Sequence, residues 1–130
     1  MIEAMRIAAT GMRAAATRME VSASNVANVA TSGRVETPQS PSDAYRPLAV
    51  TQQAGAGGVS ASVGERSAPF RLAYDPTSPD ADADGMVAMP AVDLAGEAVE
   101  QLTAKIAYEA SVKTFKIADE MAREALDILS

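Results

Sequence analysis

The sequence predicts a mostly α-helical protein, in which long N- and C-terminal helices pack as a coiled-coil-like pair and a Gly- and Pro-rich middle contains short β segments. A seven-residue apolar repeat runs through residues 1–33, and apolar residues recur at helical spacing through residues 92–130. Residues 34–91 hold all seven prolines and five of the eight glycines, so no long helix fits there. The two helices are therefore expected to form one discontinuous domain.

The first helix is predicted over residues 1–33 by a column of apolar residues at every seventh position: Met5, Met12, Met19 and Val26. A heptad repeat of this length is typical of a coiled-coil seam, and the small residues beside the column let a partner helix come close. A single amphipathic helix packed inside a globule is the alternative. Gly33 is the expected stop, since Pro38 forbids continuation soon afterwards.

The middle, residues 34–91, contains short alternating runs that predict strands. The runs occupy residues 45–52, 59–63 and 70–74, and a Gly-rich tip at residues 54–58 separates the first two. They predict a small hairpin or a three-stranded patch. Because an isolated two-stranded hairpin is marginal in water, this zone is expected to lean on another part of the protein.

The second helix is predicted over residues 92–130, with Asp93 as its N-cap. Its large apolar residues form two ridges, with small residues such as Ser111 and Ala118 between them. Two ridges are more than one antiparallel partner helix can cover, which indicates contact with several neighbours. The residues expected to pack between subunits are Met5, Met12, Met19, Val26, Ile106, Tyr108, Phe115, Ile117, Met121 and Ile128.

Composition argues against several classes of function. The 130 residues include neither Cys nor His, which removes the usual zinc ligands and the commonest general base, so we expect no enzyme, no cofactor, no metal and no small-molecule substrate. The net charge of −6 argues against nucleic acid and anionic membranes as partners. Glu3, Arg6 and Arg13 interrupt the apolar runs near the N-terminus, so no cleavable signal peptide is expected.

The core of a lone chain is expected to be thin. The sequence has only three Tyr, two Phe and no Trp, and much of its apolar fraction is alanine, which buries little area per residue. Long helices whose apolar faces need several partners are therefore expected to fluctuate in the monomer and to order on assembly.

An acidic stretch at residues 79–90 matches the first half of a calcium-binding loop. Asp80, Asp82 and Asp84 alternate and Gly85 follows, as in an EF-hand, but the position of the closing Glu is Ala91. A small calcium-binding module is therefore the less favoured alternative. We interpret the stretch as an exposed turn before the C-terminal helix, formed by Asp82, Asp84, Gly85 and Pro90.

Two amides lie on one face near the end of the first predicted helix. Asn25 and Asn28, in "SASNVANVATSG", are three residues apart. They either bind backbone groups of a neighbouring chain or soften a helix end, and the residues alone do not decide between these roles.

The S-N-x-A-N run, the Gly- and Pro-rich middle and the long C-terminal amphipathic helix together resemble the axial proteins of the bacterial flagellum. Within them, residues 74–115 are similar to the proximal-rod proteins of the FlgC type. The positions that carry this match are Tyr74, Pro76, Ala83, Gly85, Val87, Pro90, Val92, Tyr108 and Ala110. The chain departs from the family pattern at Met86, where the family usually has an aromatic residue, and at Ala91 and Ser111, where it usually has Asn.

The resemblance implies a structural subunit of the proximal rod that assembles through its terminal helices into the torque-transmitting axial tube. Its implied partners are copies of itself and other rod subunits, with Asn25 and Asn28 as contacts that fix register. It also implies export through the flagellar type III apparatus without a cleaved signal, and a place in the periplasmic part of the basal body. Another rod-type axial subunit is the alternative position.

Overall fold

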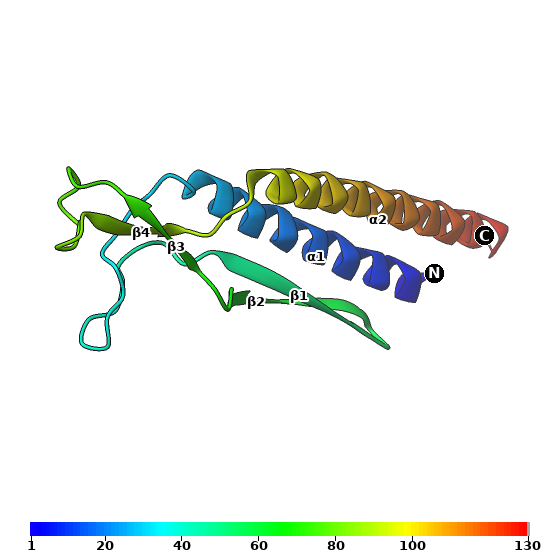
Figure 1. The fold of residues 1–130 in the computed structure, drawn as a ribbon. Helices are drawn as coiled ribbons and strands as arrows, with labels where there is room; N and C mark the ends of the chain where they lie inside the picture. Colours follow the sequence, from blue (N-terminus) through cyan, green and yellow to red (C-terminus); the bar gives the residue numbers. More distant parts are fainter. Residues whose placement is uncertain (130) are drawn as a thin grey trace.

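The computed structural model describes residues 1–129 and shows an elongated molecule (Figure 1). Helix α1 spans Ile2–Ala27 and helix α2 spans Leu94–Leu129. Between them lie the strands β1 (Leu48–Gly55), β2 (Gly58–Glu65), β3 (Phe70–Tyr74) and β4 (Met86–Pro90). Two long terminal helices with short antiparallel strands between them are confirmed. Residue 130, the last of the predicted second helix, lies outside the described residues.

The two helices run antiparallel, side by side, so both chain ends lie at one end of the molecule (Figure 1). The β1–β2 hairpin lies along α1 on the side away from α2, and the β3–β4 pair lies beyond the opposite end of the helix pair. Helix α1 is therefore the central element, because it contacts both α2 and the long hairpin. The N-cap of α2 is Asp93 as expected, since its Oδ1 accepts the N–H of Ala95 at 3.2 Å.

Small residues form the seam between the two helices. Ala8, Ala15 and Ser22, spaced seven apart on α1, are buried, as are Ala104 and Ala118 on α2. The predicted column of Met5, Met12, Met19 and Val26 is only half-buried and lies beside this seam. The heptad period was thus read correctly, but its centre lies on the small residues, because Ala and Ser let two backbones approach more closely than Met does.

The two helices come close together at Gly11. A Cβ atom on Gly11 would lie 2.7 Å from the hydroxyl oxygen of Ser111 in α2. Such tight packing places little apolar area in the seam itself and leaves the larger side chains of both helices on its borders.

Helix α1 ends at Ala27, so the predicted stop at Gly33 is wrong. Asn28 is the C-cap, and its side-chain amide donates to the carbonyl oxygen of Ser24 at 2.8 Å, which satisfies one of the free carbonyls of the last turn. Gly33 serves a different purpose. Its N–H and C=O both bond to Ala88 at 2.9 Å, and a Cβ there would collide with the backbone of Ala44.

The predicted middle strands exist, but as two separate two-stranded sheets instead of one patch. β1 and β2 pair from Leu48 opposite Glu65 to Gly55 opposite Gly58. This hairpin leans on α1, as expected for a two-stranded unit: the hydroxyl of Thr10 accepts the N–H of Val59 at 3.1 Å.

Strand β4 was not predicted, and it changes the place of Pro90. The expected turn before the C-terminal helix included Pro90, but this residue is buried at the end of β4, opposite Phe70. The acidic turn therefore joins β3 to β4 and does not lead directly into α2. Pro90 is tolerated in the strand because a terminal position of a two-stranded sheet does not need its missing N–H.

Candidate functional site

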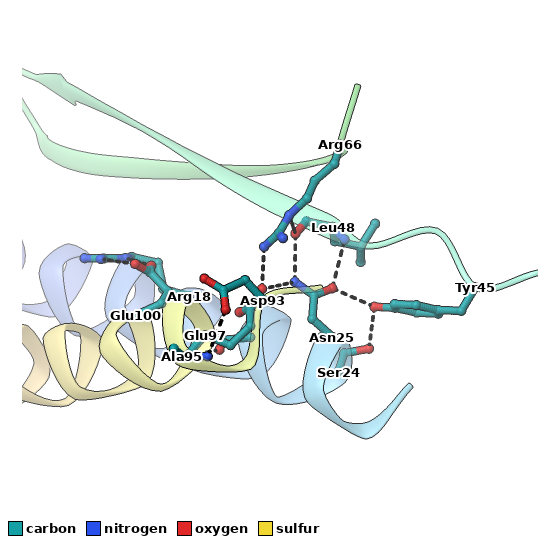
Figure 2. Close-up of polar contacts among 11 residues, drawn as sticks. Arg18, Ser24, Asn25, Tyr45, Leu48, Arg66, Asp93, Ala95, Glu97 and Glu100 are labelled. Carbon is teal, nitrogen blue, oxygen red and sulfur yellow. Dashed lines mark hydrogen bonds and ion pairs between the residues drawn. The ribbon is translucent and has the colours of Figure 1, made fainter. Parts of the chain in front are cut away.

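Two features of the molecule bear on function: a buried polar cluster that joins its parts and a set of exposed apolar faces on its helices. The cluster, here called the polar clasp, consists of the side chains of Asn25, Tyr45, Arg66 and Glu97 with the backbone of Leu48 (Figure 2). It brings together α1, the segment before β1, the residue after β2 and the first turn of α2. These segments are far apart in the sequence.

Asn25 is the centre of the polar clasp. Its Nδ2 donates to the carbonyl oxygen of Leu48 at 2.9 Å and to Glu97 Oε1 at 3.0 Å. Its Oδ1 accepts the N–H of Leu48 at 2.9 Å and the hydroxyl of Tyr45 at 3.0 Å. The side chain is 1% exposed, and all of its polar atoms are used inside the chain.

Glu97 supplies the charge of the clasp. The residue is 3% exposed, and its carboxylate is paired with the guanidinium of Arg66 as well as with Asn25. Arg66 Nε donates in addition to the carbonyl oxygen of Leu48 at 3.2 Å. A buried charge needs an opposite charge and hydrogen bonds, and the clasp gives Glu97 Oε1 both.

The two amides predicted to fix register between subunits have contacts within their own chain. Asn25 is buried in the polar clasp, so its amide has no free donor or acceptor for a neighbouring chain. Asn28 donates to Ser24 within its own helix end, which is the simpler of the two roles considered for it. Asn25 therefore fixes the position of β1 against the helices within one subunit.

Sequence reasoning did not find the partners of Asn25. The sequence analysis linked none of Glu97, Tyr45 and Arg66 to Asn25. Asn25 and Glu97 are 72 positions apart, so no local spacing pattern links them. The only hint in the sequence was that an amide occupies a position suited to a buried residue in an otherwise apolar helix.

A second ion pair joins the helices one turn from the clasp. Arg18 Nε and Nη2 contact the two carboxylate oxygens of Glu100 at 2.5 and 2.9 Å (Figure 2). The hydrogen bond from Arg18 lowers the pKa of Glu100 below its ordinary value, and the same bond raises the pKa of Arg18. This bidentate ion pair fixes the register of α1 against α2.

The acidic turn binds its own backbone. Asp82 Oδ1 accepts the N–H groups of Asp84 at 2.9 Å and Met86 at 2.8 Å, and Gly85 has a φ of +77°. Within residues 1–129 no group of three acidic side chains is arranged to hold a metal ion. One carboxylate oxygen of Asp82 thus fixes the backbone of the turn.

Large apolar side chains are exposed on two sides of α2. Of the residues predicted to pack between subunits, Ile106 is 59% exposed, Ile117 57% and Ile128 85%. Tyr108 and Phe115 are exposed on a different side, which borders α1. The predicted residues of α2 therefore remain available for contacts beyond the chain.

A groove between the helices collects part of this surface. The Met groove, of about 550 Å³, has the buried Ala15 and Ala104 at its base and Met19 and Tyr108 as its largest lining side chains. Its lining is almost wholly apolar, with Lys105 among the charged residues at its rim. The groove lies beside the seam, on the side where the predicted Met column lies.

The helices also carry the likeness to known proteins. The family described as flagella basal body rod protein matches residues 5–33, and the family described as flagellar basal body rod FlgEFG protein C-terminal matches residues 83–128. The flagellar basal-body rod protein FlgC of Salmonella typhimurium is 36% identical over 129 residues, covering 94% of this chain and 92% of that protein. The chain belongs to the FlgC family of flagellar basal-body rod proteins.

FlgC proteins of two other bacteria are also similar to this chain over most of its length. The FlgC protein of Bacillus subtilis is 31% identical over 142 residues, covering 95% of each chain, and that of Aquifex aeolicus is 35% identical over 122 residues, covering 91% and 89%. The two family matches contain most of α1 and α2 and thus the seam, Asn25 and Glu97. No helix within residues 1–129 is long and apolar enough to cross a membrane.

Proposed function

We propose that this rod protein works by assembly, as a structural subunit of the flagellar basal-body rod that binds its neighbours through the exposed apolar faces of its terminal helices. The proposal rests on how small and large apolar residues are distributed between the sides of α2. Its small residues pack on α1, while Ile106, Ile117 and Ile128 are more than half exposed. Monomeric soluble proteins rarely leave a contiguous apolar strip of this kind uncovered.

Within the rod, we propose a proximal position on the resemblance of residues 74–115 to the proximal-rod type, and the exposed surface residues support the contacts. The proposed packing set is the one that the sequence predicted: Met5, Met12, Met19, Val26, Ile106, Tyr108, Phe115, Ile117, Met121 and Ile128. The partners are further copies of the chain and other rod subunits. The polar clasp contributes by giving each subunit one defined shape before its apolar faces meet.

The same family membership supports a proposal about export and location. We propose that the chain leaves the cytoplasm through the flagellar type III apparatus, keeps its N-terminus and assembles in the periplasm. Mass spectrometry of the protein from purified basal bodies is expected to show a chain that begins at Met1 or Ile2. A chain that begins further inside α1 would contradict export without cleavage. Such a chain would also lack part of the helix that forms the seam.

The test of assembly replaces two exposed residues of one ridge. In the variant Ile106→Asn with Ile117→Asn, each change removes about 2–3 kcal/mol of burial at a subunit contact, because a large aliphatic side chain becomes polar. Cells that carry it are expected to export the protein but to be non-motile, with no rod in electron micrographs of their basal bodies. Both sites are exposed in the monomer, so its own fold is little affected.

Lys116→Asn is the matched control, since Lys116 is exposed on the charged side of the same helix turn. This variant is expected to swim normally. Normal basal bodies in the Ile106 and Ile117 double variant would refute assembly through this face.

A further inference from the structure

The β1–β2 hairpin has two edges on which backbone groups point away from the ladder. Its two-residue loop makes Gly55 and Gly58 a hydrogen-bonded pair. Hydrogen-bonded and non-hydrogen-bonded pairs alternate along an antiparallel ladder, and residues of the second kind point their N–H and C=O groups outward. Two of these outward residues, Leu48 and Val59, are hydrogen-bonded to side chains of α1, which confirms the direction of their backbone groups.

The other outward residues lie on opposite halves of the two edges. On β1 they lie in the half nearer the loop, and on β2 in the half farther from it: Val50, Gln52 and Ala54, and Ala61, Val63 and Glu65. Within residues 1–129, the outward N–H and C=O groups of these residues bond to no other segment. Val50 and Ala61 are half-buried, and the others are exposed. Each residue therefore offers one donor and one acceptor to a partner.

The hairpin lacks the features that keep other strands off a sheet edge. Natural sheets block their edges with charged residues, proline or β-bulges. Residues 48–64 contain no charged residue and no proline, although charged residues make up 22% of the sequence. The pairing of β1 with β2 runs from the first pair to the last without a bulge. Such an edge suits an extended backbone as its partner.

We propose that the hairpins of successive copies of this chain pair edge to edge, with β1 of one copy beside β2 of the next. When two hairpins point the same way, β1 of one is antiparallel to β2 of the other. Matching the three free residues of each edge gives one register: Val50 opposite Glu65 of the next copy, Gln52 opposite its Val63 and Ala54 opposite its Ala61. This register is shifted by two residues from that within the chain, where Gln52 lies opposite Ala61.

The partner is a second copy because both edges are on one chain and their spacing fits. Among the helices and strands of residues 1–129, the hairpin contacts α1 and not α2, so one copy is about one helix wide across these layers (Figure 1). Two strands of a sheet are about 10 Å wide, and adjacent helices pack about 8–10 Å apart. A row of hairpins and the row of helices beside it can therefore advance by the same step.

The proposed contact joins two different edges and repeats from copy to copy. Contacts of this heterologous kind generate a ring or a helical row, here with a continuous antiparallel sheet on the α1 side. A two-fold dimer through β1 would reverse every second copy and leave each β2 edge unpaired. The inference rests on the proposed function and deepens it, because it assigns a subunit contact to residues outside the terminal helices.

The absence of cysteine from the sequence allows a crosslinking test with single thiols. One strain makes two forms of the chain, Gln52→Cys and Val63→Cys, of which one carries a peptide tag. Because each form has one thiol, every crosslink joins two copies. A short bifunctional thiol reagent is applied to purified basal bodies. The expected product is a dimer that contains one copy of each form, and neither form is expected to crosslink to itself.

A strain with Gln53→Cys and Val63→Cys is the matched control. Gln53 has the same side chain as Gln52 and is also exposed, but its side chain lies on the opposite face of the hairpin. The control pair is expected to crosslink several-fold less. Ala54→Cys with Ala61→Cys samples the next pair of the proposed register and is expected to crosslink as well. Circular dichroism spectra of the free variants that match that of the unmodified chain show that each keeps its fold.

Three outcomes would overturn the inference. Crosslinks between two copies of Gln52→Cys indicate a two-fold contact between β1 edges. Crosslinks only to a different rod protein assign the edge to that protein. If basal bodies contain the chain but neither pair of the register crosslinks, the edges are not paired with a second copy. In all three cases the proposed function stands, whereas absence of the chain from purified basal bodies would contradict the proposed function itself.

Discussion

At the scale of single residues, Asn25 and Asn28 have the same side chain in different surroundings, and the structure predicts different consequences for their removal. Asn25→Ala leaves the backbone groups of Leu48 and part of the Glu97 carboxylate without partners in a buried place. The expected loss is about 3 kcal/mol of folding free energy. Asn28→Ala removes only one helix-end hydrogen bond and is expected to cost less than about 1 kcal/mol.

Urea unfolding of the two single variants, followed by circular dichroism, measures this difference. Rod assembly in cells is expected to fail for Asn25→Ala and to continue for Asn28→Ala. Equal effects of the two substitutions would contradict the central place of Asn25 in the polar clasp.

Glu100 gives the protein a residue-level pH dependence. Its pKa is lowered in the folded state by the hydrogen bond from Arg18, so the folded chain holds the proton less tightly than the unfolded chain does. The ion pair therefore contributes stability above the pKa of the unfolded state, and this contribution is lost as the pH falls through the folded value. The loss is expected to begin as the pH falls below the ordinary pKa of a glutamate, about 4.3.

The measurement compares the unfolding midpoint at pH 7 and pH 3.5 for the chain and for Glu100→Gln. The glutamine variant is expected to be less stable at pH 7 and to lose less on acidification, because one source of the pH dependence is gone. An unchanged pH dependence in Glu100→Gln would show that the pair with Arg18 does not contribute.

At the scale of elements, the docking of the β1–β2 hairpin on α1 depends on one glycine. Gly58 has a φ of +112°, and a Cβ there would collide with the hydroxyl of Thr10. Gly58→Ala is therefore expected to cost about 1–3 kcal/mol, through backbone strain and loss of the bond from Val59 to Thr10. Hydrogen exchange of the β1 and β2 amides is expected to accelerate.

Gly64→Ala is the control for this element, because nothing lies within 4 Å of its added Cβ. That variant, on the same strand, is expected to match the unmodified chain. Unchanged exchange in Gly58→Ala would show that the hairpin does not depend on its close contact with α1.

The helices and strands also show how much of the fold can be predicted from the sequence. Helical periodicity predicted both helices, because a pattern sustained over many turns is hard to mistake. It did not place the seam, since Ala8 and Ala15 repeat with the same period as Met5 and Met12 and only tertiary packing selects between them. Strand β4 was missed because Gly85 and Pro90, which bound it, read as a turn.

The polar contacts were beyond sequence reasoning for a related reason. Local spacing can place Asn25 on a helix face, but its partners come from three other segments. In contrast, helical spacing predicted two apolar ridges on α2, which is more than one partner helix covers, and the residues of these ridges are exposed. The sequence thus predicted the exposed residues of α2 better than it predicted contacts between segments that lie far apart in the chain.

At the scale of the whole molecule, the two ends of the helix pair are held unequally. Near the polar clasp, the Arg18–Glu100 ion pair and buried hydrogen bonds join the helices, whereas toward the chain ends the seam consists of contacts such as Gly11 against Ser111. We predict that in the dilute monomer the amides of residues 2–12 and 112–128 exchange fast and those around Asn25 and Glu97 slowly. Uniform slow exchange along both helices would contradict this prediction.

Assembly is expected to remove the difference between the ends. In the proposed assembly, neighbouring subunits cover the apolar sides of α2 and offset the entropic cost of ordering the half of α2 nearer the C-terminus. A chain that is loosely ordered alone and firm in the rod would also suit the proposed export.

The most direct test of assembly through the sides of α2 is the rate at which a thiol-specific reagent labels Ile117→Cys in the free chain and in purified basal bodies. The sequence has no other cysteine, so the signal reports that position alone. We predict fast labelling in the free chain, strong protection in basal bodies, and fast labelling of a Lys116→Cys control in the free chain. Equally fast labelling of Ile117→Cys in assembled rods and in the free chain would contradict the account.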